Sequence, residues 1–412
     1  MTKRIKTIES VDSWSWTQIL LLVSCGFLVF SPVSSFISQS ILGLPLSLPE
    51  LFFLPYFFYL RKIFDFKINV KILVAGLLII LALIAIAMLV GNFGLFAILS
   101  TARSYFYMLL AYAIFKNKKI DTLFHVMHIA VGTVLGWLSI SLYNINALML
   151  DVEGGRIIAY GNMLALSLAV SIPIIFDKVK IKYLIFVCGI ILSATSGIRR
   201  QILVFLVSYL SGVILSMRGS LTKVLKAVGV LVFLSAILIA IYPIFEEKVR
   251  DVSPQLHFRV FVASATLMSE GFGATESDQV RSGIITIWVD SLEDSLFPKG
   301  FVSRQIGTDR LNIHNKGDVG VGIFKDFPLL ELTYTYGIIV VLFFILFFMR
   351  CIFFHLRKYY IEGIRESAVC LVSALIICAL FMIEGSFLGF VYATPFTGFV
   401  FARIFSRRNL VA

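Results

Sequence analysis

The chain has 412 residues, of which 59% are hydrophobic and only 15% are charged. This balance excludes an ordinary water-soluble fold, because soluble domains carry about 25% charged residues. The formal net charge of +12 does not indicate nucleic-acid binding, since most lysines and arginines lie in short connectors between apolar segments. The five cysteines lie in or beside apolar segments, so neither a disulfide framework nor a thiolate metal site is expected.

Apolar segments that are long enough to cross a membrane follow one another along the chain. A helical span needs roughly 20 mostly apolar residues. Residues 72–90 are apolar almost throughout and lack the alternation of a membrane β-barrel strand. The first segment has no convincing cleavage site and is interpreted as a retained span. We predict an all-α integral membrane protein with about 12 transmembrane helices. The predicted spans are 16–36, 43–60, 72–90, 95–115, 123–143, 157–176, 183–195, 200–216, 227–245, 328–349, 367–383 and 386–405.

Lysines and arginines gather in alternate connectors. Short cytoplasmic loops retain positive charge, so these connectors and both termini are assigned to the cytoplasm. The chain is then a single polytopic membrane domain, residues 1–412. The basic residues of the connectors are Arg61, Lys62, Lys67 and Lys71; Lys116, Lys118 and Lys119; Lys178, Lys180 and Lys182; Arg218, Lys223 and Lys226; and Arg350, Arg357, Lys358 and Arg365.

One connector on the opposite side of the membrane is far longer than the others. This large periplasmic or extracellular loop covers residues 246–327, between spans nine and ten, and contains more acidic than basic residues. Apolar residues recur in it at steps of three and four from Val280 onward, which predicts an amphipathic helix. Ser277 can cap that helix, and Pro298 with Gly300 can end it. We expect the helix to pack over the spans.

Five arginines lie near the outer ends of the predicted spans or on the loop helix. A cation within hydrocarbon is costly, so an arginine there suggests a function. Guanidinium groups match phosphate oxygens bidentately, and such a cluster favours a diphosphate group bound at the outer face. Snorkelling to lipid headgroups is the alternative interpretation of any single one. The five are Arg103, Arg156, Arg199, Arg200 and Arg281.

Acidic residues and histidines near the same face are candidates for general acid–base chemistry. His314 lies in a polar part of the large loop, Asp326 precedes the tenth span, and Glu331 lies one turn inside it. A solvated loop explains His314 and Asp326 individually, whereas a carboxylate inside a span is more often functional. His125 and His128 have helical spacing but no third ligand nearby, so no metal site is expected. No nucleotide or dinucleotide motif is present.

Four short patterns follow one another in the order typical of one family. With the topology above, they resemble the O-antigen polymerase and ligase family of bacterial envelope glycosyltransferases. Ligases typically show histidine where this chain has Asp326, which favours a polymerase. The patterns are Arg156 followed by Asn162 at the start of a span; Ser196 followed by Arg199 and Arg200; Arg281, Trp288 and Pro298-x-Gly300; and Asp326 followed by Leu329, Leu330, Glu331 and Gly337.

The resemblance implies a GT-C-like enzyme of the bacterial inner (plasma) membrane. It would need no metal or cofactor and would move a growing glycan from undecaprenyl diphosphate to the next lipid-linked repeat unit at the outer face. The product would be O-antigen of lipopolysaccharide, a capsule or an exopolysaccharide. Catalytic roles would fall to Arg281, His314, Asp326 and Glu331, and binding of the diphosphate or substrate to Arg103, Arg156, Asn162, Arg199 and Arg200.

The same resemblance implies the partners of the chain. They are an undecaprenyl-diphosphate-linked oligosaccharide and membrane lipids, with a flippase and a chain-length regulator as candidate protein partners and no nucleic acid. Two other functions are kept as alternatives. One is a ligase that transfers finished glycan to lipid A core or to protein. The other is a transporter or flippase of lipid-linked oligosaccharide, since charges within spans also mark substrate paths.

Overall fold

The computed structural model describes residues 16–33, 69–90, 95–116, 122–148, 162–176, 189, 199–217, 246, 250, 296–301, 328–383, 388 and 393–406. Within these ranges the regular elements are all helices and no strand occurs. Five of these helices are long and apolar enough to cross a membrane, which confirms the prediction of an all-α chain suited to a membrane. The five are α4 (Val70–Val90), α5 (Leu95–Phe115), α6 (Thr122–Leu148), α15 (Ile338–Tyr360) and α16 (Arg365–Ile383).

Shorter helices complete the described part of the chain. They lie where spans were predicted, but two of them begin later than predicted. Helix α7 begins at Met163, within the predicted span 157–176, and α18 begins at Thr394, within the predicted span 386–405. The predicted spans 43–60 and 227–245 and nearly all of 183–195 lie outside the described residues, so the total of 12 spans stays a prediction. The shorter helices are α1 (Trp16–Leu28), α7 (Met163–Ile175), α9 (Arg199–Ser216), α14 (Pro328–Tyr336) and α18 (Thr394–Ile404).

The single span predicted at 328–349 is wrong, because the structure has two helices there, α14 and α15, separated by Gly337. Gly337 has a φ of +81° and a ψ of 150°, an extended conformation with positive φ that is essentially restricted to glycine. Helix α15 then continues to Tyr360. Arg350 and Arg357, assigned above to a connector, therefore lie on a helix, and Arg357 in its last turn suits the negative end of the helix dipole.

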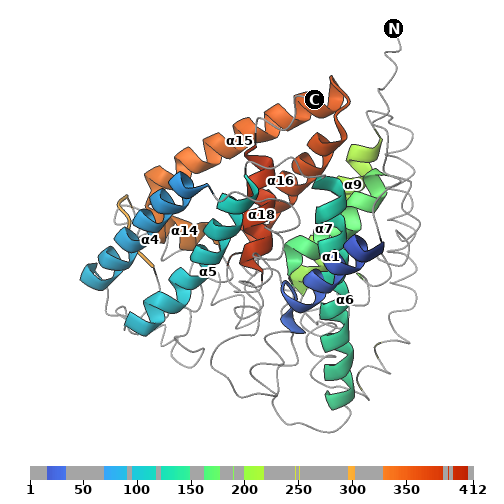
Figure 1. Ribbon diagram of the computed structural model, residues 1–412, viewed down its shortest axis with the longest axis horizontal. Helices are drawn as coiled ribbons and strands as arrows, with labels where there is room; N and C mark the ends of the chain where they lie inside the picture. Colours follow the sequence, from blue (N-terminus) through green and yellow to red (C-terminus); the bar gives the residue numbers. More distant parts are fainter. Residues whose placement is uncertain are drawn as a thin grey trace.

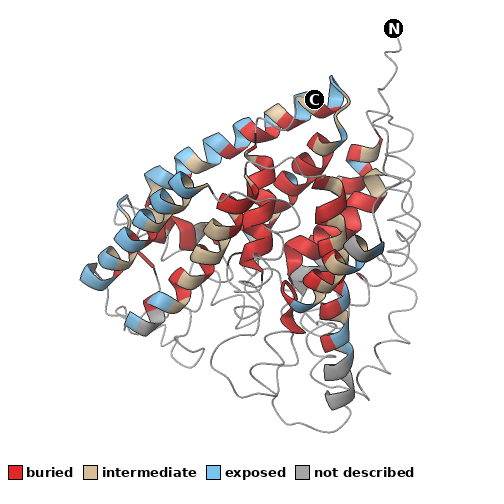
Figure 2. Ribbon diagram, in the orientation of Figure 1, coloured by how far each residue is buried: buried red, intermediate tan, exposed pale blue. Residues whose placement is uncertain are grey.

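Helix α16 lies at the centre of the described helices, where it packs against α7, α9, α14, α15 and α18. Figure 1 shows α15 along one edge of the molecule and α4 at another. Buried residues concentrate on α7, α16 and α18, whereas α4 and α15 are exposed along most of their length (Figure 2). The exposed residues are large and apolar, as expected for surfaces that contact hydrocarbon rather than water. Examples are Leu78, Leu81, Leu89, Phe343, Leu346 and Phe353.

Helices α1 and α6 approach closely through glycines. Gly132 and Gly136 have the Gly-xxx-Gly spacing that lets two membrane helices touch backbone to backbone. A Cβ atom on Gly132 would overlap the carbonyl oxygen of Val23, and one on Gly26 would lie 2.9 Å from the amide nitrogen of Thr133. The two helices can therefore pack this closely only because these glycines have no side chains.

Two hydrogen bonds show which helix ends lie together. Nε2 of the buried His355 lies 2.8 Å from the carbonyl oxygen of Ile404, and the Tyr359 hydroxyl donates to the carbonyl of Leu215 at 2.7 Å. The C-terminal ends of α9, α15 and α18 thus meet at one end of the bundle, called here the His355 end. The starts of α9 and α14 lie at the opposite end, called here the Gly300 end.

Candidate functional site

The segment that enters the Gly300 end from the large loop binds the break between α14 and α15. This segment, residues 296–301, is called here the return segment. The carbonyls of Tyr334 and Thr335 would accept amide donors from the next turn if α14 continued as a helix. Instead, the amide of Lys299 donates to Tyr334 at 3.0 Å and the amide of Gly300 donates to Thr335 at 3.3 Å. Irregular backbone at membrane depth is tolerated only when protein satisfies it in this way.

Two glycines allow the return segment to approach this closely. Gly300 has a φ of +80°, and a Cβ atom there would overlap the carbonyl oxygen of Leu83 and lie 2.5 Å from the amide nitrogen of Ala87. A Cβ atom on Gly337 would lie 2.7 Å from the carbonyl oxygen of Leu296. Helix α4, the return segment and the α14–α15 break are therefore packed backbone against backbone. The glycine at position 300 is thus required by the close approach to α4.

A buried tyrosine–carboxylate pair lies beside the return segment. The Tyr105 hydroxyl of α5 donates to Oε1 of Glu331 on α14 at 3.1 Å, and the two residues are only 3% and 5% exposed. Phe301 and Tyr336 hold the Tyr105 ring from two sides, with ring centroids 5.1 Å and 6.1 Å away. The aromatic contacts fix the ring, and the ring fixes the direction of the hydroxyl toward the carboxylate.

Glu331 is placed where a carboxylate can be stabilised. It lies in the first turn of α14, a helix that begins with Pro328, and so lies near the positive end of the helix dipole. A buried carboxylate is costly unless it accepts hydrogen bonds, and the Tyr105 hydroxyl is one such donor. A carboxylate held in this way can orient a substrate hydroxyl or remove its proton.

Arg103 lies on the same helix as Tyr105 but not on the same face. The two residues are two positions apart, and helix positions i and i+2 do not face each other. Arg103 is half-buried, whereas Tyr105 is buried. Arg103 is therefore close to the tyrosine–carboxylate pair along the axis of α5, but its side chain leaves the helix on a different face from Tyr105.

Asn162 is the N-cap of α7. Its Oδ1 accepts a hydrogen bond from the amide of Ala165 at 3.1 Å, which satisfies one of the free amides at the helix start. The residue is fully buried, and its Nδ2 has no hydrogen-bond partner in the structure as described. The position that the resemblance assigned to substrate binding thus combines a structural capping role with a spare donor.

Helices α7 and α9 start at the same end of the bundle. The Ser171 hydroxyl donates to the carbonyl of Ser208 at 2.7 Å, and a Cβ on Gly212 would lie 3.2 Å from Cβ of Ile174, so the two helices run in the same direction. Their starts therefore share the Gly300 end with α14, although Figure 1 draws α14 and this pair on either side of α16 and α18. The predicted positions concerned are Asn162, Arg199 and Arg200, and the side chains of both arginines lie outside the description.

Four predicted site residues and the loop helix fall outside the described residues. Residues 298–301 are not helical, and the predicted loop helix itself lies outside the described residues. The four residues are Arg156, Arg281, His314 and Asp326.

The two histidines at the start of α6 are occupied by local contacts. His128 Nδ1 lies 2.7 Å from the carbonyl oxygen of Phe124, whose ring packs against the imidazoles of both His125 and His128. Among the residues that the structure describes, no three His, Cys, Asp or Glu side chains are grouped in a way that could hold a metal ion.

Tyr105 is the functional candidate that sequence reasoning missed. It is separated from Glu331 by 226 positions, so no local motif links the two residues. The available signal is chemical: a tyrosine deep in a span needs a partner for its hydroxyl, and the carboxylate in a span needs a donor. Pairing such residues across predicted spans would have suggested this contact.

No model of a known protein family matches the chain, and no curated protein matches it.

Proposed function

We propose that the protein is a membrane glycosyltransferase that polymerises a bacterial surface polysaccharide. The growing glycan would move from undecaprenyl diphosphate to the next lipid-linked repeat unit. One observation carries the proposal: the carboxylate of Glu331 is buried at the start of a broken helix, bonded to Tyr105, under a segment that returns from the large polar loop. A carboxylate within apolar helices is costly and so marks a functional site.

The proposed reaction uses the carboxylate and the arginines in different roles. The anomeric carbon–oxygen bond to the diphosphate breaks while a hydroxyl oxygen of the acceptor forms a new bond to that carbon. Glu331 takes the hydroxyl proton, with Asp326 and His314 as alternative bases. Arg103 and the predicted arginines 156, 199, 200 and 281 stabilise the negative charge that develops on the leaving diphosphate. The donor bond supplies the free energy, so ATP is not consumed.

The proposed topology places the Gly300 end at the outer face of the plasma membrane and the His355 end in the cytoplasm. It is supported by the positive-inside rule, since Arg357, Lys358 and Arg365 flank the turn between α15 and α16 at the His355 end. The 12 predicted spans and cytoplasmic termini belong to the same proposal.

The proposal is tested with purified protein in liposomes that contain lipid-linked repeat units and no ATP. A polymerase yields a ladder of products that differ by one repeat. Product on an added lipid A core instead would indicate a ligase. Absence of any product longer than one repeat, with protein that elutes as a single species, would overturn the polymerase assignment.

A second candidate, transport of a lipid-linked saccharide, is favoured by the break at Gly337. Discontinuous helices near the membrane interior form substrate sites in many transporters. The two functions separate cleanly, because a transporter moves a fluorescent lipid-linked sugar between leaflets without breaking its diphosphate bond. Transfer of label between leaflets with an unchanged product pattern would select transport.

A further inference from the structure

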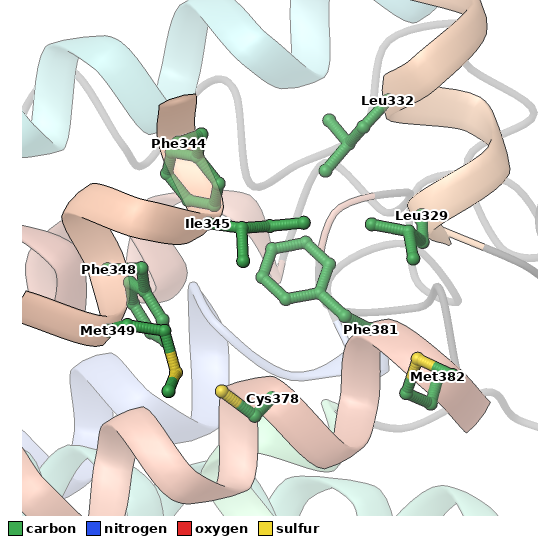
Figure 3. Close-up of a pocket in the computed structure, with 9 residues that line it drawn as sticks. All are labelled: Leu329, Leu332, Phe344, Ile345, Phe348, Met349, Cys378, Phe381 and Met382. Carbon is green, nitrogen blue, oxygen red and sulfur yellow. The ribbon is translucent and has the colours of Figure 1, made fainter. Parts of the chain in front are cut away.

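An apolar cavity of about 240 Å³ lies beside α14, the helix that carries Glu331. It lies between α14, α15 and α16, and Figure 3 shows side chains from all three helices turned toward the same space. Among the residues that the structure describes, the lining carries no charged side chain, and its one polar group is the thiol of Cys378. The lining residues are Leu329, Leu332, Phe344, Ile345, Phe348, Met349, Cys378, Phe381 and Met382.

The cavity opens on the surface of the helices that faces hydrocarbon. Ile345, Met349 and Met382 at its margin are 37%, 43% and 65% exposed, and the outward face of α15 continues as exposed apolar side chains. Cavities lined by such side chains exclude water, and an apolar cavity of about 150 Å³ takes up benzene. By proportion, the larger cavity here has room for about ten carbon atoms.

The cavity is short compared with the hydrocarbon of one leaflet. Along α15 the lining runs from Phe344 to Met349, which lie about 9 Å and 16 Å from Ile338 at a rise of about 1.5 Å per residue. One leaflet contributes about 15 Å of a hydrocarbon core about 30 Å thick. The cavity therefore extends along α15 for about half the thickness of one leaflet's hydrocarbon, so it holds part of a single chain.

We propose that the cavity binds the distal part of an acyl chain from a membrane phospholipid. The cavity holds a short chain segment rather than a long isoprenoid, and phospholipid is by far the more concentrated ligand, which favours its occupancy by mass action. Leu329 and Leu332 contact the chain, and Glu331 lies between them in sequence on the same helix. The bound chain supports α14, the helix whose Glu331 carboxylate accepts the hydrogen bond from Tyr105. This inference does not rest on glycosyl transfer.

The test uses the full-length protein in vesicles of phosphatidylethanolamine and phosphatidylglycerol, with a trace of phospholipid that carries a diazirine near the end of one acyl chain. After irradiation, mass spectrometry maps the labelled peptides. Labelling is expected on the α16 segment that contains Cys378 and Met382. In Cys378→Trp, which fills the cavity, labelling of this segment should fall about tenfold, equivalent to about 1.4 kcal/mol of binding free energy. Leu375→Trp, on the exposed side of α16, should label like the wild type.

Three results would overturn the inference. One is equal labelling of this segment in the Cys378→Trp and Leu375→Trp proteins. Another is label spread evenly over the exposed face of α4 and the cavity residues. The third is loss of labelling by the diazirine phospholipid when an isoprenyl diphosphate is added at the same mole fraction as that probe. This result would assign the cavity to an isoprenoid chain. Because Cys378→Trp can fail to fold, Met349→Phe provides a second cavity-filling variant, and only proteins that elute as a single species are compared.

Discussion

The hydrogen bond between Tyr105 and Glu331 can be removed with little change in shape. Tyr105→Phe deletes the hydroxyl that donates to Oε1 of Glu331 at 3.1 Å and leaves the ring between Phe301 and Tyr336. A hydrogen bond to a charged group contributes about 1.5–3 kcal/mol. We expect the free energy of unfolding to fall by that amount, because both groups are buried and water cannot replace the lost donor.

The assay is reversible unfolding in mixed micelles, read by circular dichroism, in a double-mutant cycle with Glu331→Gln. The coupling free energy between the two sites should lie at about 0.5–3 kcal/mol, the range found for residues in contact. Tyr112→Phe serves as the matched control, since Tyr112 lies on α5 as well but packs against Phe405. The reasoning is refuted if Tyr105→Phe and Tyr112→Phe cost the same and the coupling free energy is below about 0.3 kcal/mol.

Three further predictions concern two close glycine contacts and one buried hydrogen bond. Gly300→Ala should lower the melting temperature in detergent more than Gly363→Ala. Both glycines have positive φ, a conformation that costs other residues about 1–2 kcal/mol. Only the Cβ at position 300 would also collide with neighbouring atoms. Gly132→Leu should separate α1 from α6 and reduce the yield of protein that elutes as a single species; an unchanged yield would contradict the close contact. Arg403→Met removes the 2.8 Å hydrogen bond from Nε to Oγ1 of Thr122. The free energy of unfolding, measured by unfolding in mixed micelles, should fall by about 1.5–3 kcal/mol. A fall below about 0.5 kcal/mol, the size expected of an ordinary surface substitution, would contradict a stabilising role for this hydrogen bond.

The helices could be predicted from sequence because membrane helices are defined by apolar length. Helix α5 has the bounds of the predicted span 95–115, and α16 ends where its predicted span ends. Glu331 was identified for the same reason, since a carboxylate is conspicuous within an apolar run. These features depend on local composition, which the sequence displays directly.

The break at Gly337 and the partner of Glu331 depend on distant residues. Apolarity does not report backbone conformation, so a glycine that ends one helix and starts another is hidden within a continuous apolar segment. The break is stabilised by amides of the return segment, and Tyr105 comes from a helix more than 200 positions away. Only the packed structure brings these groups together.

The central claim, that Glu331 belongs to a glycosyl-transfer site, is tested most directly by the initial rate of chain extension. The rate is measured in liposomes with equal amounts of folded wild-type protein, Glu331→Gln and Glu331→Asp. General acid–base catalysis contributes about 10²–10⁴-fold, so Glu331→Gln should lose at least about 100-fold while Glu331→Asp retains part of the activity. A folded Glu331→Gln protein that extends chains at the wild-type rate would contradict the account.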